Sequence, residues 1–259
     1  MSNGVAGAGA TPKQQLRLLF LGCGYATRIH SGVLKKMRDV EMVYASRDAA
    51  RAAEYCAKYG GVASYGSYEL ALADASVDVA LVATPTSTHA ELTLMALAAG
   101  KHVIVEKPAF MSSADTARVR EAARAAGRLV FVAENYVYKP LAYELRDKIG
   151  SGALGDVRFV LVNATKEQNA EGWRAEPSLS GGGALFEAGI HWISFMTHLG
   201  LDVVRVEGIR VGSSAGADRS SVVLFRYGNG AGGTLSHSWE LRAPFGGARA
   251  SKIQGTRGT

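Results

Sequence analysis

The sequence is poor in cysteine. Its 259 residues include only two, Cys23 and Cys56, and neither stands in a metal-ligand spacing. Two thiols are too few for a disulfide framework, which excludes the small disulfide-rich secreted folds. We therefore predict a reducing, cytoplasmic compartment and no bound metal.

Long apolar runs and clusters of positive charge are also missing. No apolar run approaches the length of a membrane span, which argues against an integral membrane protein. The net charge is +6, but the Lys and Arg residues are dispersed and do not cluster with aromatic residues as in nucleic-acid binders. The first 15 residues contain no charged segment followed by an apolar core, so we expect a flexible soluble tail. A small anionic partner, such as a phosphorylated cofactor, remains compatible with this charge.

Residues 16–136 alternate between apolar strands and helices. Apolar runs at 16–22, 41–46, 78–84, 102–106 and 129–134 each precede a segment with helical spacing or turn residues. Ser112 and Asp115 form a capping box at the start of one helix, which Gly127 ends, and Gly100 ends the helix before it. Strands buried on both faces and separated by helices predict an α/β unit with a doubly wound parallel sheet, the Rossmann fold.

The pattern changes over residues 137–259. A helix at 140–150 leads to a strand at 156–165, and a second helix at 183–200 precedes three further strands. The pair Asn229-Gly230 between the last two of these predicts a hairpin. We predict a second, α+β domain with an open and largely antiparallel sheet, and the cleft between the two domains is the expected place for chemistry.

A glycine turn follows the first strand. Gly22 and Gly24 open the next helix, which is the setting of a dinucleotide fingerprint, although Thr27 replaces its third glycine or alanine. The second strand ends at Ser46 and Arg47, where an NAD site usually has an acid. A serine leaves room for a 2′-phosphate that an arginine can bind, so these residues favour NADP. The alternative is that Ser46 and Asp48 only cap the next helix.

Charged and polar residues follow two further strands. The loop Thr84–Thr86 ends one of them, and "VEKPAF" ends the next with Glu106, Lys107 and Pro108. Ligands of doubly wound sheets bind beyond the carboxyl ends of the strands, so a nicotinamide ring and its substrate should lie near Lys107. His89, in the loop after Thr86, is more often a structural residue than a catalytic one.

Four segments together resemble one family of enzymes. The glycine turn with His30, "TPTSTH", "AGKHVIVEKP" and "GGGALFEAGIH" occur in the order found in the glucose-fructose oxidoreductase, inositol dehydrogenase and rhizopine-catabolism family (Gfo/Idh/MocA). The resemblance extends from about residue 16 to the end of the chain. It implies NAD(P)-dependent chemistry on sugars, cyclitols or related polyols, a cis peptide before Pro108, and contact of Lys107 with nicotinamide and substrate.

The resemblance also assigns the site residues. His191 matches the acid/base of the family, and Glu187 replaces its usual aspartate. Glu187 and His191 are four residues apart, so we expect them on one helix face, with Glu187 orienting the catalytic pair. The predicted catalytic residues are Lys107, His191 and Glu187. The predicted substrate contacts are Lys107, Tyr136, Arg174 and His191, where Arg174 meets a hydroxyl or a carboxylate. The predicted cofactor contacts are Gly22, Gly24, Tyr25, Ala26, Ser46, Arg47, Thr84, Pro85, Thr86, His89, Glu106, Lys107, Pro108 and Asn135.

The sequence thus predicts an oxidoreductase that interconverts a secondary alcohol and a ketone, with NADP preferred over NAD. Two alternatives remain: a non-catalytic NAD(P)-binding regulator of the same fold, and a relative that acts on an imine or a dihydrodiol. We expect a homo-oligomer that associates through the C-terminal sheet. The chain ends at "KIQGTRGT", a segment resembling an interior strand and turn of the family, so we also expect the second domain to be incomplete.

Overall fold

The computed structural model describes residues 15–212, 216–242 and 250–259, so the predicted tail lies outside the described residues except for Gln15. The chain forms two compact units. The first contains the chain up to Thr84 together with Leu92–Ile104 and Glu121–Val130. The second contains Pro85–Glu91, Val105–Arg120 and Phe131–Thr259, so the loop that bears Lys107 belongs to it. No helix among the described residues is both long enough and apolar enough to cross a bilayer.

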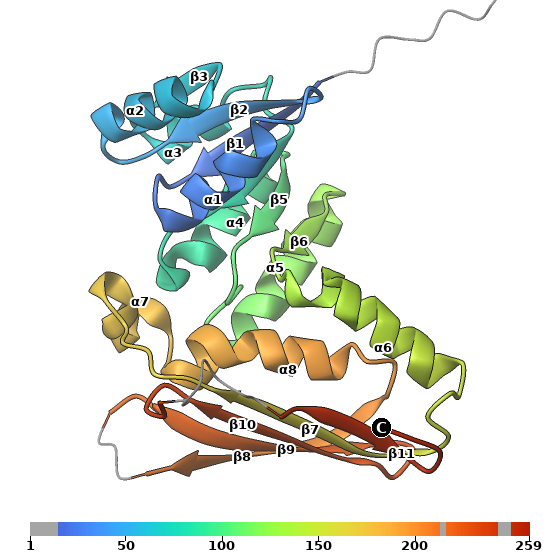
Figure 1. Cartoon of the computed structure of the whole chain (residues 1–259). Helices are drawn as coiled ribbons and strands as arrows, with labels where there is room; N and C mark the ends of the chain where they lie inside the picture. The colour runs from blue at the N-terminus through green and yellow to red at the C-terminus, as the bar shows by residue number, and fades with distance from the viewer. Residues whose placement is uncertain (1–14, 213–215, 243–249) are drawn as a thin grey trace, which may run out of the picture. The chain divides into compact units, whose positions relative to one another are not determined.

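The first sheet has the strand order β3-β2-β1-β4-β5-β6, and β1 pairs in parallel with both β2 and β4 (Figure 1). This order is that of the dinucleotide-binding doubly wound fold and confirms the predicted Rossmann sheet. The strands are β1 (Leu16–Leu21), β2 (Val40–Ala45), β3 (Ala63–Tyr65), β4 (Val79–Val82), β5 (His102–Val105) and β6 (Val130–Val132). The helices that connect them are α1 (Tyr25–Leu34), α2 (Ala49–Tyr59), α3 (Tyr68–Leu72), α4 (His89–Ala98) and α5 (Ser113–Ala126).

An aromatic and aliphatic core holds this sheet together. Leu19, Phe20 and Leu21 of β1 are fully buried, and the ring of Tyr44 on β2 stacks on Phe20 with 5.2 Å between centroids. Burial raises the pKa of the Tyr44 hydroxyl to about 12, although that hydroxyl donates a hydrogen bond to Ser31 Oγ. The capping box before α5 is confirmed, because Ser112 Oγ accepts from the backbone N–H of Asp115.

The second unit has a five-stranded sheet of order β11-β7-β10-β9-β8. β10 runs parallel to β7, whereas the pairs β10–β9, β9–β8 and β11–β7 are antiparallel, as predicted for an open, largely antiparallel sheet. The hairpin at Asn229-Gly230 joins β9 to β10, and Gly230 has the positive φ of +85° that such a turn requires. The elements are α6 (Pro140–Gly150), β7 (Val157–Thr165), α7 (Pro177–Ser180), α8 (Ile190–Thr197), β8 (Val203–Val211), β9 (Ser220–Tyr227), β10 (Gly232–Ser238) and β11 (Lys252–Gly255).

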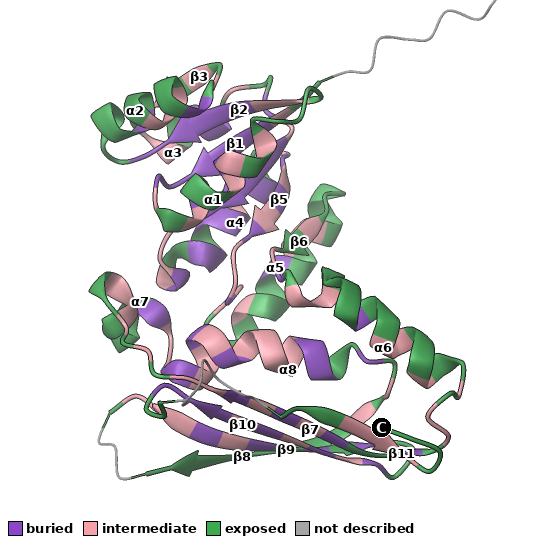
Figure 2. Cartoon of the chain, viewed as in Figure 1, coloured by how far each residue is buried: buried purple, intermediate pink, exposed green. Residues whose placement is uncertain are grey.

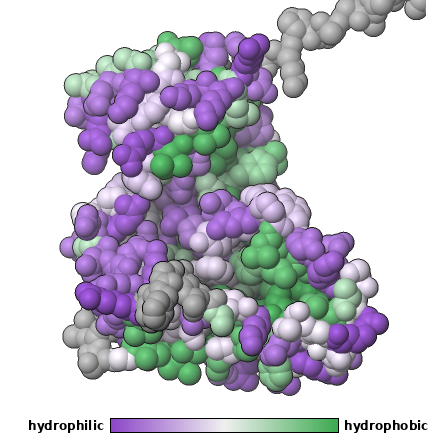
Figure 3. Space-filling view, viewed as in Figure 1, coloured by the Kyte–Doolittle hydropathy of each residue, from purple (hydrophilic) through white to green (hydrophobic). Residues whose placement is uncertain are grey.

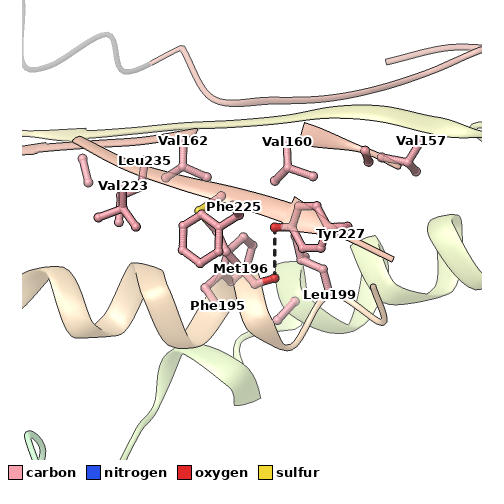
Figure 4. Close-up of a cluster of buried hydrophobic side chains, with 13 residues drawn as sticks. Val157, Val160, Val162, Phe195, Met196, Leu199, Val223, Phe225, Tyr227 and Leu235 are labelled. Atoms are coloured by element: carbon pink, nitrogen blue, oxygen red, sulfur yellow. Dashed lines mark hydrogen bonds between the residues drawn. The ribbon is translucent and has the colours of Figure 1, made fainter. Parts of the chain in front are cut away.

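Helix α8 packs on one face of this sheet (Figures 1 and 4). Its apolar residues Phe195 and Met196, with Leu199 beyond its end, meet Val160 of β7 and Leu235 of β10. The edge strand β8 is exposed along almost its whole length, whereas β10 is largely buried (Figure 2). Apolar side chains of this strand, such as Ile209 and Val211, are exposed. Figure 3 shows hydrophobic surface at the bottom of the view, where the second sheet lies in Figure 1.

Candidate active site

The glycine turn of the first unit has a shape that only glycine can supply. Gly22 has φ +104°, and a Cβ there would lie 2.8 Å from the carbonyl O of Ala83. At Gly24 the nearest atom to an added Cβ is 3.9 Å away, which leaves open space at the start of α1. Thr27 is fully buried, and its hydroxyl donates to the carbonyl O of Gly22 at 2.6 Å. The threonine in the fingerprint therefore stabilises the turn from inside.

Arg51 and Tyr55 of α2, which the sequence did not single out, also stabilise the glycine turn. Arg51 Nε donates to the carbonyl O of Cys23 at 2.6 Å, and the hydroxyl of Tyr55 donates to the carbonyl O of Gly24 at 3.2 Å. Their spacing of four residues places them on one helix face, which is the signal that could have identified them. Burial raises the pKa of the Cys23 thiol to about 11, so this thiol is protonated near neutral pH.

Ser46 and Arg47 adopt different environments at the end of β2. Ser46 is buried, and its Oγ accepts from the backbone N–H of Asp48, whose carboxylate in turn caps α2 by accepting from the N–H of Arg51. Arg47 is exposed. Burial raises the pKa of the Tyr68 hydroxyl, and the nearby charge of Arg47 opposes that rise. The capping alternative is thus present, and Arg47 remains accessible to an anion.

The arrangement of this turn fits a dinucleotide. The backbone N–H groups at the start of a helix bind anions, and α1 begins at Gly24, where no side chain blocks the approach of a pyrophosphate. The remaining predicted contacts lie in three segments, which follow β4, β5 and β6. Thr86 Oγ1, in the second unit, is buried with no hydrogen-bond partner among the described residues. Its position is consistent with a bound polar group.

His89 occupies a different environment from the one expected of a cofactor contact. It is only 1% exposed, and its Nδ1 lies 3.0 Å from the carbonyl O of Pro108 and 3.1 Å from that of Ala109. A ring buried in this way supports the loop after β5 and has little surface left for a ligand. Tyr25, by contrast, is 62% exposed with Arg28 over its ring, and Ala26 and Asn135 also lie at the surface in part or in full.

The loop after β5 places Lys107 beside Glu187. The peptide between Lys107 and Pro108 is cis, as predicted. Lys107 Nζ donates to the backbone carbonyl O of Glu187 at 2.9 Å and lies 3.7 Å from Glu187 Oε1. Glu106 accepts a hydrogen bond from the backbone N–H of Lys107. Both charges of the "VEKP" segment are therefore engaged within the second unit.

Glu187 joins Lys107 to Arg174. Glu187 is only 8% exposed, and its Oε1 also accepts from Arg174 Nε at 3.0 Å. The segment Leu185–Gly189 that contains Glu187 is a π-helical turn, a feature frequent at functional sites. Asp218 caps this turn, since its carboxylate accepts from the backbone N–H of Leu185 at 2.9 Å.

His191 pairs with Glu134, whereas Glu187 pairs with Lys107 and Arg174. The Nδ1 of His191 lies 2.8 Å from both carboxylate oxygens of Glu134, which is 7% exposed. Sequence reasoning missed Glu134, although it stands two residues after the end of β6, much as Glu106 and Lys107 follow β5. Acids at the carboxyl ends of neighbouring parallel strands could have suggested it.

Charge and stacking fix the histidine further. Burial alone would raise the pKa of Glu134, but hydrogen bonds from His191 and the N–H of Tyr136, with the charges of His191 and Lys107, lower it. The ring of Tyr136 stacks on that of His191 with 4.5 Å between centroids, and Lys139 Nζ lies 3.2 Å from the centroid of the Tyr136 ring. An ionised carboxylate accepts only, so Nδ1 carries the proton and Nε2 is left to accept another.

The cluster has the parts of a proton-transfer site. It combines a histidine held in one tautomer by a buried carboxylate with a lysine and an arginine that share a second buried carboxylate. No group of three or more His, Cys, Asp or Glu that could hold a metal ion occurs within the described parts of the chain. Acid/base and electrostatic chemistry is what these side chains offer.

The class of protein follows from residues 16–134, which match a family model described as "Oxidoreductase family, NAD-binding Rossmann fold". Residues 143–259 match the model "GFO/IDH/MocA C-terminal domain". The chain belongs to the Gfo/Idh/MocA family of oxidoreductases.

Similar proteins are dehydrogenases. Human trans-1,2-dihydrobenzene-1,2-diol dehydrogenase is 31% identical over 219 residues, covering 83% of this chain and 63% of that protein. D-glucoside 3-dehydrogenase of Escherichia coli (strain K12) is 29% identical over 201 residues, 76% of this chain and 57% of that protein. The crystal structure of GenD2 from gentamicin A biosynthesis in complex with NAD matches with a TM-score of 0.85 and 26% identity, covering 98% of this chain and 74% of that one. The chain thus spans about three fifths of the length of these curated relatives.

Proposed function

We propose that this chain is an NAD(P)-dependent dehydrogenase that interconverts a secondary hydroxyl and a ketone on a sugar or cyclitol. The observation that supports this most is the pairing of His191 with the buried Glu134 in the same unit as Lys107. A histidine held in this way can accept a hydroxyl proton, and an ammonium group can stabilise the oxygen that becomes negative.

When bound, the nicotinamide supplies the hydride chemistry. His191 Nε2 takes the proton of the substrate hydroxyl, and Glu134 stabilises the imidazolium that results. Lys107 stabilises the developing oxyanion, and Glu187 keeps the ammonium in position through its carbonyl and carboxylate. Arg174 contributes to substrate contact beside Glu187. Gly22, Gly24 and the start of α1 hold the pyrophosphate.

The substrate class is supported by the relatives, one named for a glucoside and one for a dihydrobenzenediol. A dihydrodiol is therefore the second candidate substrate. Both are secondary alcohols with a neighbouring hydroxyl, so the same acid/base arrangement would serve either. A substrate panel containing both classes separates them.

Single-turnover hydride transfer at several pH values tests the proposal. Lys107→Ala and His191→Ala should each lose turnover, by about a hundred-fold to ten-thousand-fold for the histidine, while cofactor binding persists. Lys148→Ala and His198→Ala are matched controls, because both residues are exposed and outside the cluster. Full activity of either site variant would remove that residue from the mechanism. Tight NADPH binding with no turnover on any panel member would favour the non-catalytic regulator.

We also propose NADP as the preferred cofactor, on the grounds that Ser46 leaves no acid at the ribose and Arg47 is exposed beside it. Arg47→Ala should weaken NADP binding by about 1.5 to 3 kcal/mol, the contribution of a hydrogen bond to a charged group, and leave NAD binding little changed. Lys58→Ala at the other end of α2 is the control for a lost surface charge. Tighter binding of NAD than NADP by the wild type in calorimetry would refute the preference.

Two further proposals concern the state of the protein in the cell. Exposed apolar side chains on the second sheet, such as Phe159 at 54% and Ile209 at 53%, support association of copies through that sheet. Light scattering of the wild type and an Ile209→Lys variant would test this association. Free thiols at Cys23 and Cys56 support a cytoplasmic location.

A further inference from the structure

The cationic side chains of the candidate site pair with carboxylates of the protein itself. Lys107 Nζ and Arg174 Nε both approach the same carboxylate oxygen of Glu187, at 3.7 Å and 3.0 Å. The second carboxylate, Glu134, accepts from His191. Glu106 adds a third carboxylate next to Lys107. Lys107 and Arg174 therefore each already have a carboxylate partner within the cluster.

The two paired carboxylates, Glu187 and Glu134, are buried, so their negative charges act strongly on a bound ligand. Glu187 and Glu134 are 8% and 7% exposed, so water screens their charges poorly. A ligand that brings its own carboxylate or phosphate would add a negative charge beside these two, and Arg174 could bind it only by sharing its charge with Glu187. A hydroxyl group, in contrast, can donate to the carboxylates and accept from Lys107 or Arg174 without any change in net charge.

We infer that the site selects uncharged polyols and that Glu187 excludes their carboxylated or phosphorylated counterparts. This inference rests on the proposed function for the location of the substrate site. Of the two groups expected to contact Arg174, a hydroxyl or a carboxylate of the substrate, the hydroxyl is then the partner. The principle is that discrimination often comes from repulsion built against the wrong ligand.

Calorimetry with paired ligands tests the inference without turnover. D-glucose with D-glucuronate, and methyl β-D-glucoside with its glucuronide, are titrated at low salt into the protein saturated with the reduced nicotinamide cofactor that it binds more tightly. Reduced cofactor and an alcohol form a complex that cannot react. We expect the wild type to bind the neutral member of a pair roughly tenfold tighter, from one repulsive charge pair at partly screened distance.

Two variants should shift this ratio in opposite directions. Glu187→Gln leaves Lys107 and Arg174 without their carboxylate, so the preference for the neutral sugar should fall by about tenfold or reverse. Arg174→Met removes a cation, so the acidic sugar should bind more weakly still. Glu176→Gln, which removes an exposed carboxylate two residues after Arg174, should keep the wild-type ratio. A purely structural role for Glu187 would not produce opposite shifts.

The outcomes separate the two proposals. Equal or tighter binding of the acidic sugar by the wild type overturns the inference, as does a shift of both variants in the same direction or failure of all the neutral sugars to bind. Hydride transfer is measured separately by nicotinamide absorbance with the oxidised cofactor. The expected binding ratios without any hydride transfer would uphold the selectivity and refute the proposed dehydrogenase activity.

Discussion

Removal of the Glu134 carboxylate is the sharpest test of the proton-transfer cluster. Glu134 is 7% exposed and lies 2.8 Å from His191 Nδ1 through both oxygens. A hydrogen bond to a charged group contributes about 1.5 to 3 kcal/mol, which corresponds to roughly a ten-fold to 150-fold loss of rate when it stabilises the imidazolium. We expect Glu134→Ala to lose at least this much in single-turnover hydride transfer.

Glu134→Gln separates charge from geometry. The amide can still accept from Nδ1 but supplies no negative charge, so its rate should also fall, and its cofactor affinity should match that of the wild type. Glu144→Gln on α6 is the control, since that carboxylate is 62% exposed and forms only a surface ion pair with Lys148. Wild-type rates and an unchanged pH profile in Glu134→Ala would refute the role of Glu134.

The same residue predicts a pH dependence of stability. The pKa of Glu134 is lowered in the folded protein, so its contribution to stability is present above the ordinary pKa of glutamate. That contribution should be lost as the pH falls through the lowered value. Chemical unfolding of the wild type and Glu134→Gln across this acidic range should therefore converge at the lowest pH. A constant difference between them would contradict the linkage.

Two other substitutions test the fold around the site. Gly22→Ala places a Cβ 2.8 Å from the carbonyl O of Ala83 at a positive φ, so the melting temperature and the dinucleotide affinity should both fall. Gly32→Ala is the control, because an added Cβ there meets no atom within 4 Å. An unchanged melting temperature and affinity in Gly22→Ala would contradict the packing of this turn. Leu235→Ala, in the fully buried core under α8, should lower the free energy of unfolding measured in urea by about 2 to 5 kcal/mol. Leu241→Ala is the control and should lower it little, because Leu241 is 54% exposed. A small effect of Leu235→Ala would argue against this core.

Much of the fold could be read from local pattern. Runs such as 18–21 and 79–82 are apolar throughout because strands of a parallel sheet are buried on both faces, and the structure places them side by side in that sheet. The short strand β3 and helix α3 escaped notice, since a three-residue strand gives no periodicity to detect. The parallel pairing of β10 with β7 also has no local signal, because it joins strands about 70 residues apart.

Some features of the candidate site could likewise be predicted from the sequence, and others could not. Lys107 and His191 were identifiable from motifs that resemble those of the family, and the glycine turn from its spacing, because the backbone of that turn demands glycine. The exchange of partners was not predictable: His191 meets Glu134, and Glu187 meets Lys107 and Arg174. A spacing of four residues predicts which side chains share a helix face, but not which residues from other segments they meet.

Local patterns predicted most of the strands and helices and the glycine turn, since these depend on hydrophobic period, capping and steric freedom over a few residues. Only the tertiary structure decided which carboxylate pairs with which base or cation. Ion pairs form between groups that folding brings within a few ångströms, and Glu134 lies 57 residues from His191 along the chain. Distance in space, which no local pattern encodes, sets the electrostatics of the site.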